Sequence, residues 1–196
     1  MNRATVADRV PRIVGIGGTR RPDSSTAQAL RIAMSAAQAA GAHTELLTGV
    51  QIDLPVYDPA PGTAGRCEAA THLIEQLRQA DGVLIATPAY HAGLSGMLKN
   101  AIDYIEELRT DVRPYLDGRA VGCIVTAAGW QGAVMTLNAL RSIVHGLRGW
   151  PTPLGAAINT SDGVFAADGS CRVPAVQAQL CGVAEQVVWF ARRARD

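Results

Sequence analysis

The chain has 196 residues, of which 48% are apolar, and its 18 basic and 17 acidic side chains give a formal net charge of +1. This composition is typical of a globular protein that buries a full core, so we expect one domain over residues 1–196. The nearly neutral balance gives no electrostatic reason to expect nucleic acid or an anionic membrane surface as a partner. No apolar run approaches the roughly 20 residues of a bilayer span.

The first twelve residues carry charges but lack the apolar stretch of a signal peptide, which favours a cytoplasmic location. The cysteines are scattered, without a C-x-x-C pair or a histidine at ligand spacing. We therefore expect free buried thiols rather than disulfides or zinc, and we predict no metal site. The four thiols are those of Cys67, Cys123, Cys171 and Cys181.

Strand-like and helix-like segments alternate along the chain. Short unbroken apolar runs predict buried strands over 10–16, 42–47, 81–87, 119–126 and 153–158. Apolar residues repeated at three and four positions predict helices over 25–40, 66–79, 94–105, 134–147 and 176–190. The proline-rich stretch 51–62 is predicted to be an exposed loop, because proline disfavours regular structure.

Five strands that alternate with helices imply an α/β fold, a parallel sheet with helices on both faces. In such sheets ligands bind outside the carboxyl ends of the strands. Three loops of this chain come there, at 17–26, 88–93 and 127–132. The sequence therefore predicts a single site at this edge of the sheet.

The loop 17–26 has the composition of a phosphate site. Gly17 and Gly18 allow a tight turn and a close approach of the backbone, hydroxyls at 24–26 stand where the next helix begins, and Arg20 adds a positive charge. A plain helix cap is the alternative interpretation. There is neither the third glycine of a dinucleotide fingerprint nor the Gly-Lys-Ser/Thr of a P-loop, so a terminal monophosphate such as that of FMN is favoured.

The other two loops combine small residues with one large ring each. In 88–93, Tyr90 offers a flat face beside a bare backbone that suits a flat heteroaromatic ring, although a simple strand-to-helix turn explains it equally well. His91 is a candidate general acid but is more often a polar surface residue. In 127–132, Trp130 either forms a pocket wall or packs under a helix or at a subunit contact.

These residues resemble the NAD(P)H-dependent FMN reductases of the flavodoxin-like superfamily. The resemblance extends over about residues 12–158 and rests on the loop 17–26, on Leu54-Pro55-Val56-Tyr57-Asp58 and above all on Thr87-Pro88-x-Tyr90-x-x-Gly93-x-Ser95-Gly96-x-Leu98-Lys99-Asn100-Ala101-Ile102-Asp103. It implies a flavodoxin-like three-layer sandwich, with a five-stranded parallel sheet of order 2-1-3-4-5 and helices on both faces.

The resemblance also implies the residues that bind the cofactor. The phosphate binders are expected to be Gly18, Arg20, Ser25 and Thr26, and the loop under the isoalloxazine ring is expected to be Pro88, Ala89, Tyr90, His91 and Gly93. Ala128 and Gly129 match a third contact region that usually holds more glycine, and His91 stands where family members often carry Asn. Lys99 and Asp103 are four residues apart, so they are expected to pair across one helical turn. We favour an oligomer or helix-packing role for them and for Asn100.

The implied function is an FMN-dependent NAD(P)H oxidoreductase, with NAD(P)H as co-substrate and a quinone, free flavin or similar small molecule as acceptor. No catalytic residue is predicted, because the cofactor carries the chemistry while Tyr90 and His91 line the site. A homodimer or homotetramer is expected. The alternatives are a flavin-dependent dehydrogenase of a biosynthetic metabolite, a nucleotide-binding regulator, and an electron carrier, for which the usual acidic docking surface is missing.

Overall fold

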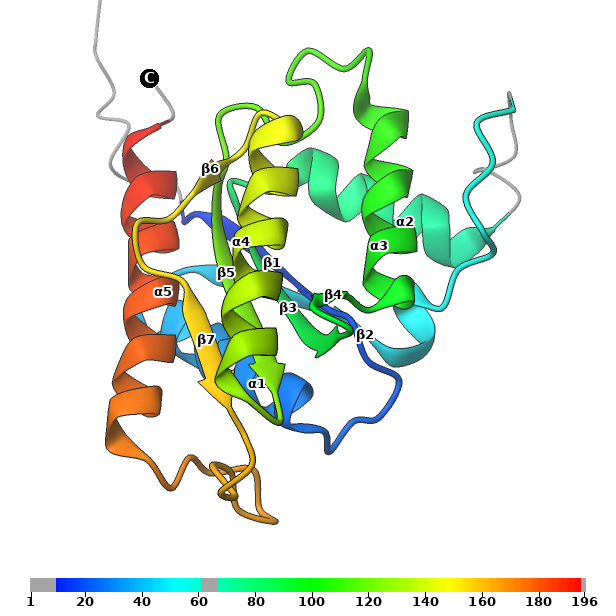
Figure 1. Cartoon of the computed structure of the whole chain (residues 1–196). Helices are drawn as coiled ribbons and strands as arrows, with labels where there is room; N and C mark the ends of the chain where they lie inside the picture. The colour runs from blue at the N-terminus through cyan, green and yellow to red at the C-terminus, as the bar shows by residue number, and fades with distance from the viewer. Residues whose placement is uncertain (1–9, 61–66, 195–196) are drawn as a thin grey trace, which may run out of the picture.

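A parallel β-sheet forms the centre of the computed structural model, which describes residues 10–60 and 67–194. The strand β1 (Arg12–Gly17) lies between β2 (His43–Thr48) and β3 (Gly82–Tyr90), and β5 (Ala120–Ala127) pairs with β3 on its other side. The short strands β6 (Trp150–Pro151) and β7 (Ala156–Asn159) both pair with β5 at the edge (Figure 1). Counting β6 and β7 as one interrupted strand gives the order 2-1-3-4-5, which confirms the predicted topology.

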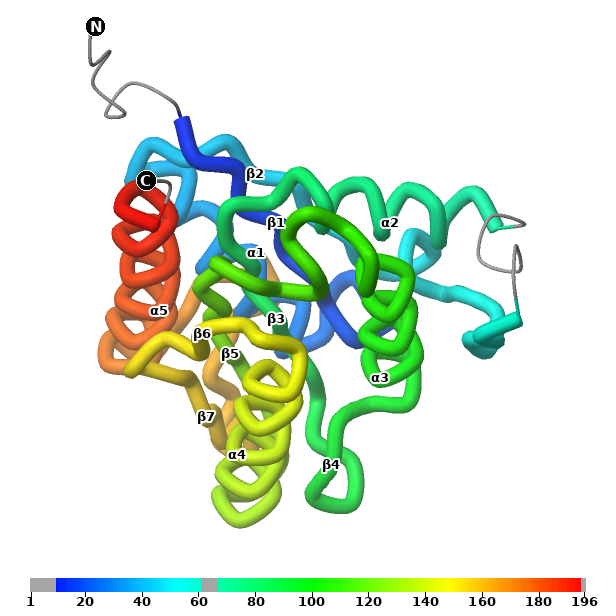
Figure 2. The backbone as a smooth tube through the Cα atoms, turned by 90° about the horizontal axis from the view of Figure 1, so that it is seen from above, coloured from blue at the N-terminus to red at the C-terminus, as the bar shows by residue number. Residues whose placement is uncertain are grey.

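Helices cover both faces of the sheet (Figure 2). The helices α1 (Ser25–Ala39) and α5 (Pro174–Arg193) pack on one face, and α2 (Glu68–Gln79), α3 (Gly96–Asp103) and α4 (Trp130–Gly146) pack on the other. Two short 3-10 helices, at Gly49–Ile52 and Tyr104–Leu108, complete the layers. In the part of the chain that the structure describes, no helix is both long and apolar enough to cross a membrane.

Alternating side chains of the central strands supply two separate cores. Ile13 belongs to the core under α1 and α5, whereas its neighbour Val14 belongs to the core under α2, α3 and α4. Because both faces are covered, the central strands are apolar at nearly every position, as their apolar runs predicted. At Gly122 an added Cβ would lie 2.6 Å from Val183 Cγ1, so the glycine lets α5 approach β5 closely.

Several boundaries differ from the predictions. The third strand does not end at residue 87 but continues to Tyr90, where a hairpin joins it to β4 (Gly93–Leu94). The fourth helix begins at Trp130 rather than at 134, so half of the predicted loop 127–132 belongs to its first turn. Parts of the predicted loop 51–62 and residue 66 of the predicted second helix lie outside the described residues.

The edge strand is split because Pro151 and Pro153 have no N–H to donate to β5. Side chains of the flanking helices bind the backbone groups that this leaves unpaired. Arg141 Nη1 donates to the Thr152 carbonyl at 2.6 Å, and Leu154 N donates to Gln186 Oε1 at 3.0 Å. The interruption is therefore a hydrogen-bonded bulge, which a pattern of apolar residues does not reveal.

All four cysteines carry free thiols. Cys123 lies in the core, where burial raises the pKa of its thiol to about 12. Cys67, Cys171 and Cys181 are only half-buried, so the expectation of buried thiols is wrong for these three.

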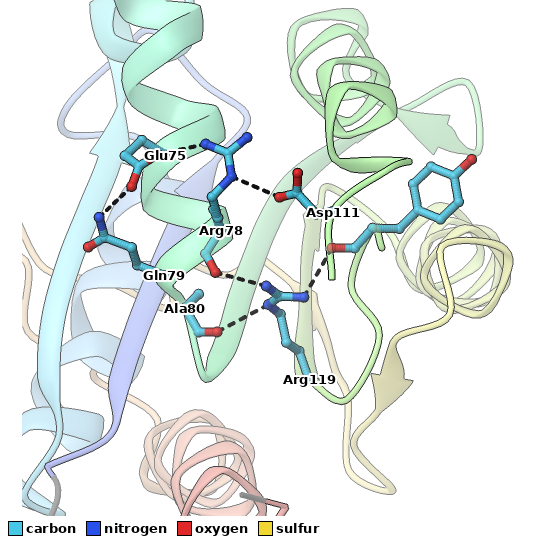
Figure 3. A network of polar contacts seen from close by, with 7 residues as sticks. Glu75, Arg78, Gln79, Ala80, Asp111 and Arg119 are labelled. Carbon is cyan, nitrogen blue, oxygen red and sulfur yellow. Dashed lines mark hydrogen bonds and ion pairs between the residues drawn. The ribbon is translucent and has the colours of Figure 1, made fainter. Parts of the chain in front are cut away.

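Arg119 joins two segments at the amino end of the sheet (Figure 3). Its side chain is 1% exposed and donates to the carbonyls of Arg78 at 3.0 Å and Ala80 at 3.1 Å, which end α2. On the other side it donates to the carbonyls of Tyr115 and Asp117 at 3.2 and 3.3 Å. Burial lowers the pKa of Arg119 to about 10, so the guanidinium stays charged at neutral pH. It fixes the connection 109–119 to the last turn of α2.

Replacing Arg119 by Met should lower the free energy of unfolding by roughly 2–4 kcal/mol, because the buried carbonyl of Ala80 and three partly buried carbonyls lose a charged donor. Urea unfolding followed by circular dichroism measures this loss. Arg109, whose side chain is 66% exposed, is the matched control, and Arg109→Met should change stability by less than about 1 kcal/mol. Equal effects of the two substitutions would contradict the role given to Arg119.

Candidate functional site

The three loops predicted to form one site do lie together at the carboxyl edge of the sheet (Figure 1). Gly17, at the end of β1, is in register with Ala86 of β3, and Pro88 of β3 is in register with Thr126 of β5. The segment after β1, the β3–β4 hairpin and the segment after β5 therefore leave the sheet side by side. Hydrogen bonds between these segments fix their relative positions.

Ser95 joins the first loop to the hairpin. Its hydroxyl donates to the Gly18 carbonyl at 2.8 Å, and its N–H donates to Thr87 Oγ1 at 3.1 Å. The same hydroxyl accepts the N–H of Leu98 at 3.2 Å, so Ser95 also caps α3. Because Ser95 is only 3% exposed, these bonds are protected from water.

Gly18 is held by both of its backbone groups. Its N–H donates to the Ala86 carbonyl at 2.8 Å, and its carbonyl accepts from Ser95. A Cβ at this position would lie 2.7 Å from Leu98 Cβ and from Ser95 Oγ, so only glycine fits here. Gly18 thus allows the close packing of the loop against α3, and its N–H is occupied within the fold.

Thr26 joins the first loop to β5. Its hydroxyl lies 2.6 Å from that of Thr126, and both side chains are buried. Ser24 is the N-cap of α1 and accepts the N–H of Ala27 at 3.2 Å. Two of the three hydroxyls expected to converge on a phosphate therefore already bind other groups of the fold. The Ser25 hydroxyl and the first-turn N–H groups of Ser25 and Thr26 remain as donors for an anion.

The start of α1 suits an anion electrostatically. Its first turn holds no acidic side chain, so the positive end of the helix dipole is not neutralised there. Arg20 is exposed beside it and forms an ion pair with Asp53, which follows the first 3-10 helix. Arg20, the residue predicted to bind the phosphate through its charge, therefore has an acidic partner that the sequence did not reveal.

The expected ring-binding loop is a rigid hairpin. Ala89 pairs with Leu94 and Tyr90 pairs with Gly93, which leaves His91 and Ala92 as the two turn residues. Both have positive φ, of 52° and 61°, as a two-residue hairpin turn of type I′ requires. The left-handed conformation thus falls on His91 and Ala92 rather than on Gly93. Tyr90 is 59% exposed beside this turn.

Ala128 and Gly129 form the third wall, at the start of α4. Ala128 is exposed, Gly129 is the N-cap, and a Cβ on Gly129 would meet no heavy atom within 4 Å. A Cβ on Gly132, in the first turn, would lie 3.9 Å from Ala89 Cβ, so this helix abuts the hairpin. Trp130 is 62% exposed, which is inconsistent with packing under a neighbouring helix.

Asn100 fixes the segment 54–57 beside the site. Its Oδ1 accepts the N–H of Tyr57 at 2.8 Å, and its Nδ2 donates to the carbonyls of Leu54 at 3.1 Å and Pro55 at 2.8 Å. Lys99 and Asp103 form the predicted pair, with Nζ 2.7 Å from Oδ1. For Asn100 the structure thus favours the packing role within the chain.

Ser95, Thr87 and Thr126 are the residues of the site that sequence reasoning did not assign. Ser95 directly precedes the helical segment that begins at Gly96, and serine is a preferred N-cap residue, so its bond to the Leu98 N–H could be predicted from the sequence. Its bond to the Gly18 carbonyl could not be predicted in this way, because the two residues are 77 positions apart in the sequence.

Comparison with known proteins identifies the family. The family described as NADPH-dependent FMN reductase matches residues 11–162. The chain belongs to this family. The match confirms the predicted family, and the family's description names the FMN and NADPH that the resemblance led us to expect.

Individual proteins similar to this FMN reductase family member have names consistent with the family. An NAD(P)H-dependent FMN reductase of Pseudomonas aeruginosa is 30% identical over 77% of this chain and 81% of its own length. An NADPH azoreductase of a Bacillus strain is 29% identical over 60% of each chain, so the match spans less than two thirds of that relative. The solved structure of a flavoenzyme NAD(P)H:(acceptor) oxidoreductase from Paracoccus denitrificans covers 93% of this chain, with a TM-score of 0.75 and 26% identity, and 97% of its own chain is matched.

The residues at the carboxyl edge fit FMN. First-turn N–H groups, a free hydroxyl and an arginine suit a phosphate, and the hairpin and the start of α4 offer small, uncharged residues to a flat ring. The open space at Gly129 lies where the predicted third contact would be.

Replacing Ser95 by Ala should lower the free energy of unfolding by roughly 1–3 kcal/mol, because the Gly18 carbonyl and the Leu98 N–H lose a buried partner. The Kd for FMN should rise as well, because the loop is no longer held against the hairpin. Urea unfolding and flavin fluorescence titration measure the two effects. Ser142→Ala removes an exposed hydroxyl of α4 and should change neither the free energy of unfolding nor the Kd for FMN. An equal response of the two variants would contradict the role given to Ser95 in holding the loop.

Proposed function

We propose that this FMN reductase family member, as a whole protein, oxidises NADH or NADPH through bound FMN and passes the electrons to a small acceptor. We expect the acceptor to be a quinone, an azo compound or free flavin. The observation that supports this is the edge of small residues on the hairpin, Ala89, Ala92 and Gly93, beside the start of α1, whose first turn holds no acidic side chain. FMN supplies the hydride and electron chemistry when bound, so the chain needs to supply position and electrostatics.

The proposal assigns a separate binding role to each wall of the site. The N–H groups of Ser25 and Thr26 and the Ser25 hydroxyl bind the phosphate, and Arg20 adds charge. Residues 88–93 and 128–129 hold the isoalloxazine ring, with Gly18 shaping the loop below. Tyr90 and His91, both exposed, line the face that the nicotinamide and the acceptor approach in turn. We further propose that residues 1–196 act as one FMN-binding domain in the cytoplasm.

Replacing Arg20 by Ala should raise the Kd for FMN by roughly 10-fold, near the lower limit for a charge-assisted contact, because Arg20 is shared with Asp53. Asp53→Asn is the matched variant, because it frees Arg20 and should leave the Kd unchanged or lower it. Fluorescence titration at fixed ionic strength measures both values. An equal weakening by the two substitutions would show that the ion pair serves the loop structure and not the phosphate.

Anaerobic mixing of the FMN-loaded protein with NADH or with NADPH tests the proposed turnover. Loss of the visible flavin absorbance is expected with at least one nicotinamide, and a quinone, an azo dye or free flavin should restore it. If neither nicotinamide bleaches the flavin within minutes while a reduced metabolite does, the biosynthetic dehydrogenase replaces this proposal.

We also propose that the chain works as a homodimer or homotetramer that associates through α3 and α4. A hollow of about 370 Å³ between these helices is lined by the half-buried Ile143 and Leu147 and the buried Ile102, next to the Lys99–Asp103 pair. Sedimentation velocity at micromolar concentration should show a species of at least twice 20.6 kDa. A 20.6 kDa species alone would contradict the proposal.

A further inference from the structure

The outer face of α5 carries a large exposed ring between two opposite charges. Glu185, Trp189 and Arg193 are spaced four residues apart, so they form one stripe along the helix, and all three are exposed. Trp189 is 57% exposed, and the Arg193 guanidinium lies 4.1 Å from the centre of its ring. The helix α5 lies on the opposite side of the molecule from α3 (Figures 1 and 2).

An apolar groove adjoins this stripe. It encloses about 650 Å³ between α5 and the edge strand β6, and Trp150, Pro151, Pro153, Trp189 and Phe190 contribute to its walls. Trp150 is 59% exposed and packs against Phe190, with 6.0 Å between ring centres. Two half-exposed tryptophans in one groove are more than scattered surface apolar residues, and such patches mark interaction sites.

The charges of the stripe are self-complementary under a twofold rotation. Glu185 and Arg193 lie at equal distances on either side of Trp189, about 6 Å along the axis in each direction. If two copies of α5 run antiparallel with the twofold axis at Trp189, Glu185 of each copy lies opposite Arg193 of the other. An isologous interface needs this kind of self-matching surface.

We propose that the stripe Glu185–Trp189–Arg193 and the groove beside it form an interface between two copies of this chain. The Trp189 rings meet at the twofold axis, next to the two grooves, and two ion pairs flank them. This interface is separate from α3 and α4, so together the two surfaces would build a homotetramer as a pair of dimers. The groove includes Ala120, at the amino end of β5, so the interface leaves the cofactor site at the carboxyl end open.

A charge-swap experiment tests the proposal on the full chain. Glu185→Arg and Arg193→Glu each place like charges opposite one another, and each should raise the Kd of this association by at least about 10-fold. The double variant Glu185→Arg/Arg193→Glu restores opposite charges and should return the Kd to near its original value. Sedimentation velocity over a dilution series measures the masses, which should fall by half in the single variants.

Matched controls separate this interface from unfolding and from the proposed α3–α4 association. Arg172→Glu reverses an exposed charge outside the stripe and should leave the mass unchanged. FMN affinity should be the same in all variants, and so should the urea unfolding midpoint when it is measured at a concentration at which every variant is dissociated at this interface. A tetramer that becomes a dimer, or a dimer that becomes a monomer, supports the proposal. An unchanged mass in the single variants, a monomeric unmodified chain or failure of the double variant to recover overturns it.

Discussion

The arrangement of the site depends on the buried hydrogen bonds of one side chain, Ser95. Parallel strands bring the segments after β1 and β3 to the same edge, but they do not fix how these segments lie against each other. Ser95 does so by binding the Gly18 carbonyl and Thr87 while it caps α3. The absence of a side chain at Gly18 is the matching requirement, because a Cβ would occupy the space of Ser95 Oγ and Leu98 Cβ.

This packing determines which donors face a cofactor. Buried polar groups need partners, so the hydroxyls of Thr26 and Ser24 and the N–H of Gly18 bind other parts of the fold. What remains for a phosphate is mostly backbone, namely the first-turn N–H groups of α1, and this first turn holds no acidic side chain. Backbone donors of a helix lose little entropy on binding, because the helix already holds them in position.

The two ends of the sheet carry different chemistry. At the carboxyl edge the walls combine small residues with the exposed rings of Tyr90 and Trp130, and turns shape them. At the amino end Arg119 holds the connections together through four carbonyls, and the groove under Trp150 and Trp189 lies beside the split edge strand. The proposed cofactor site and the proposed interface at Trp150 and Trp189 therefore use separate surfaces.

The sequence by itself determined the alternation of strands and helices, the burial of both sheet faces and the edge at which the three loops meet. These features are encoded locally, because an apolar run, a helical repeat or a glycine before a hydroxyl cluster needs no distant partner to be recognised. It also indicated the family through the segment 87–103, and the Lys99–Asp103 pair through helical spacing. The tertiary structure alone decided which polar groups stay available, because Thr26 meets Thr126 across 100 positions and Arg20 meets Asp53 across 33. It likewise placed the positive φ values on His91 and Ala92, since cross-strand pairing of Tyr90 with Gly93 leaves these two residues to make the turn.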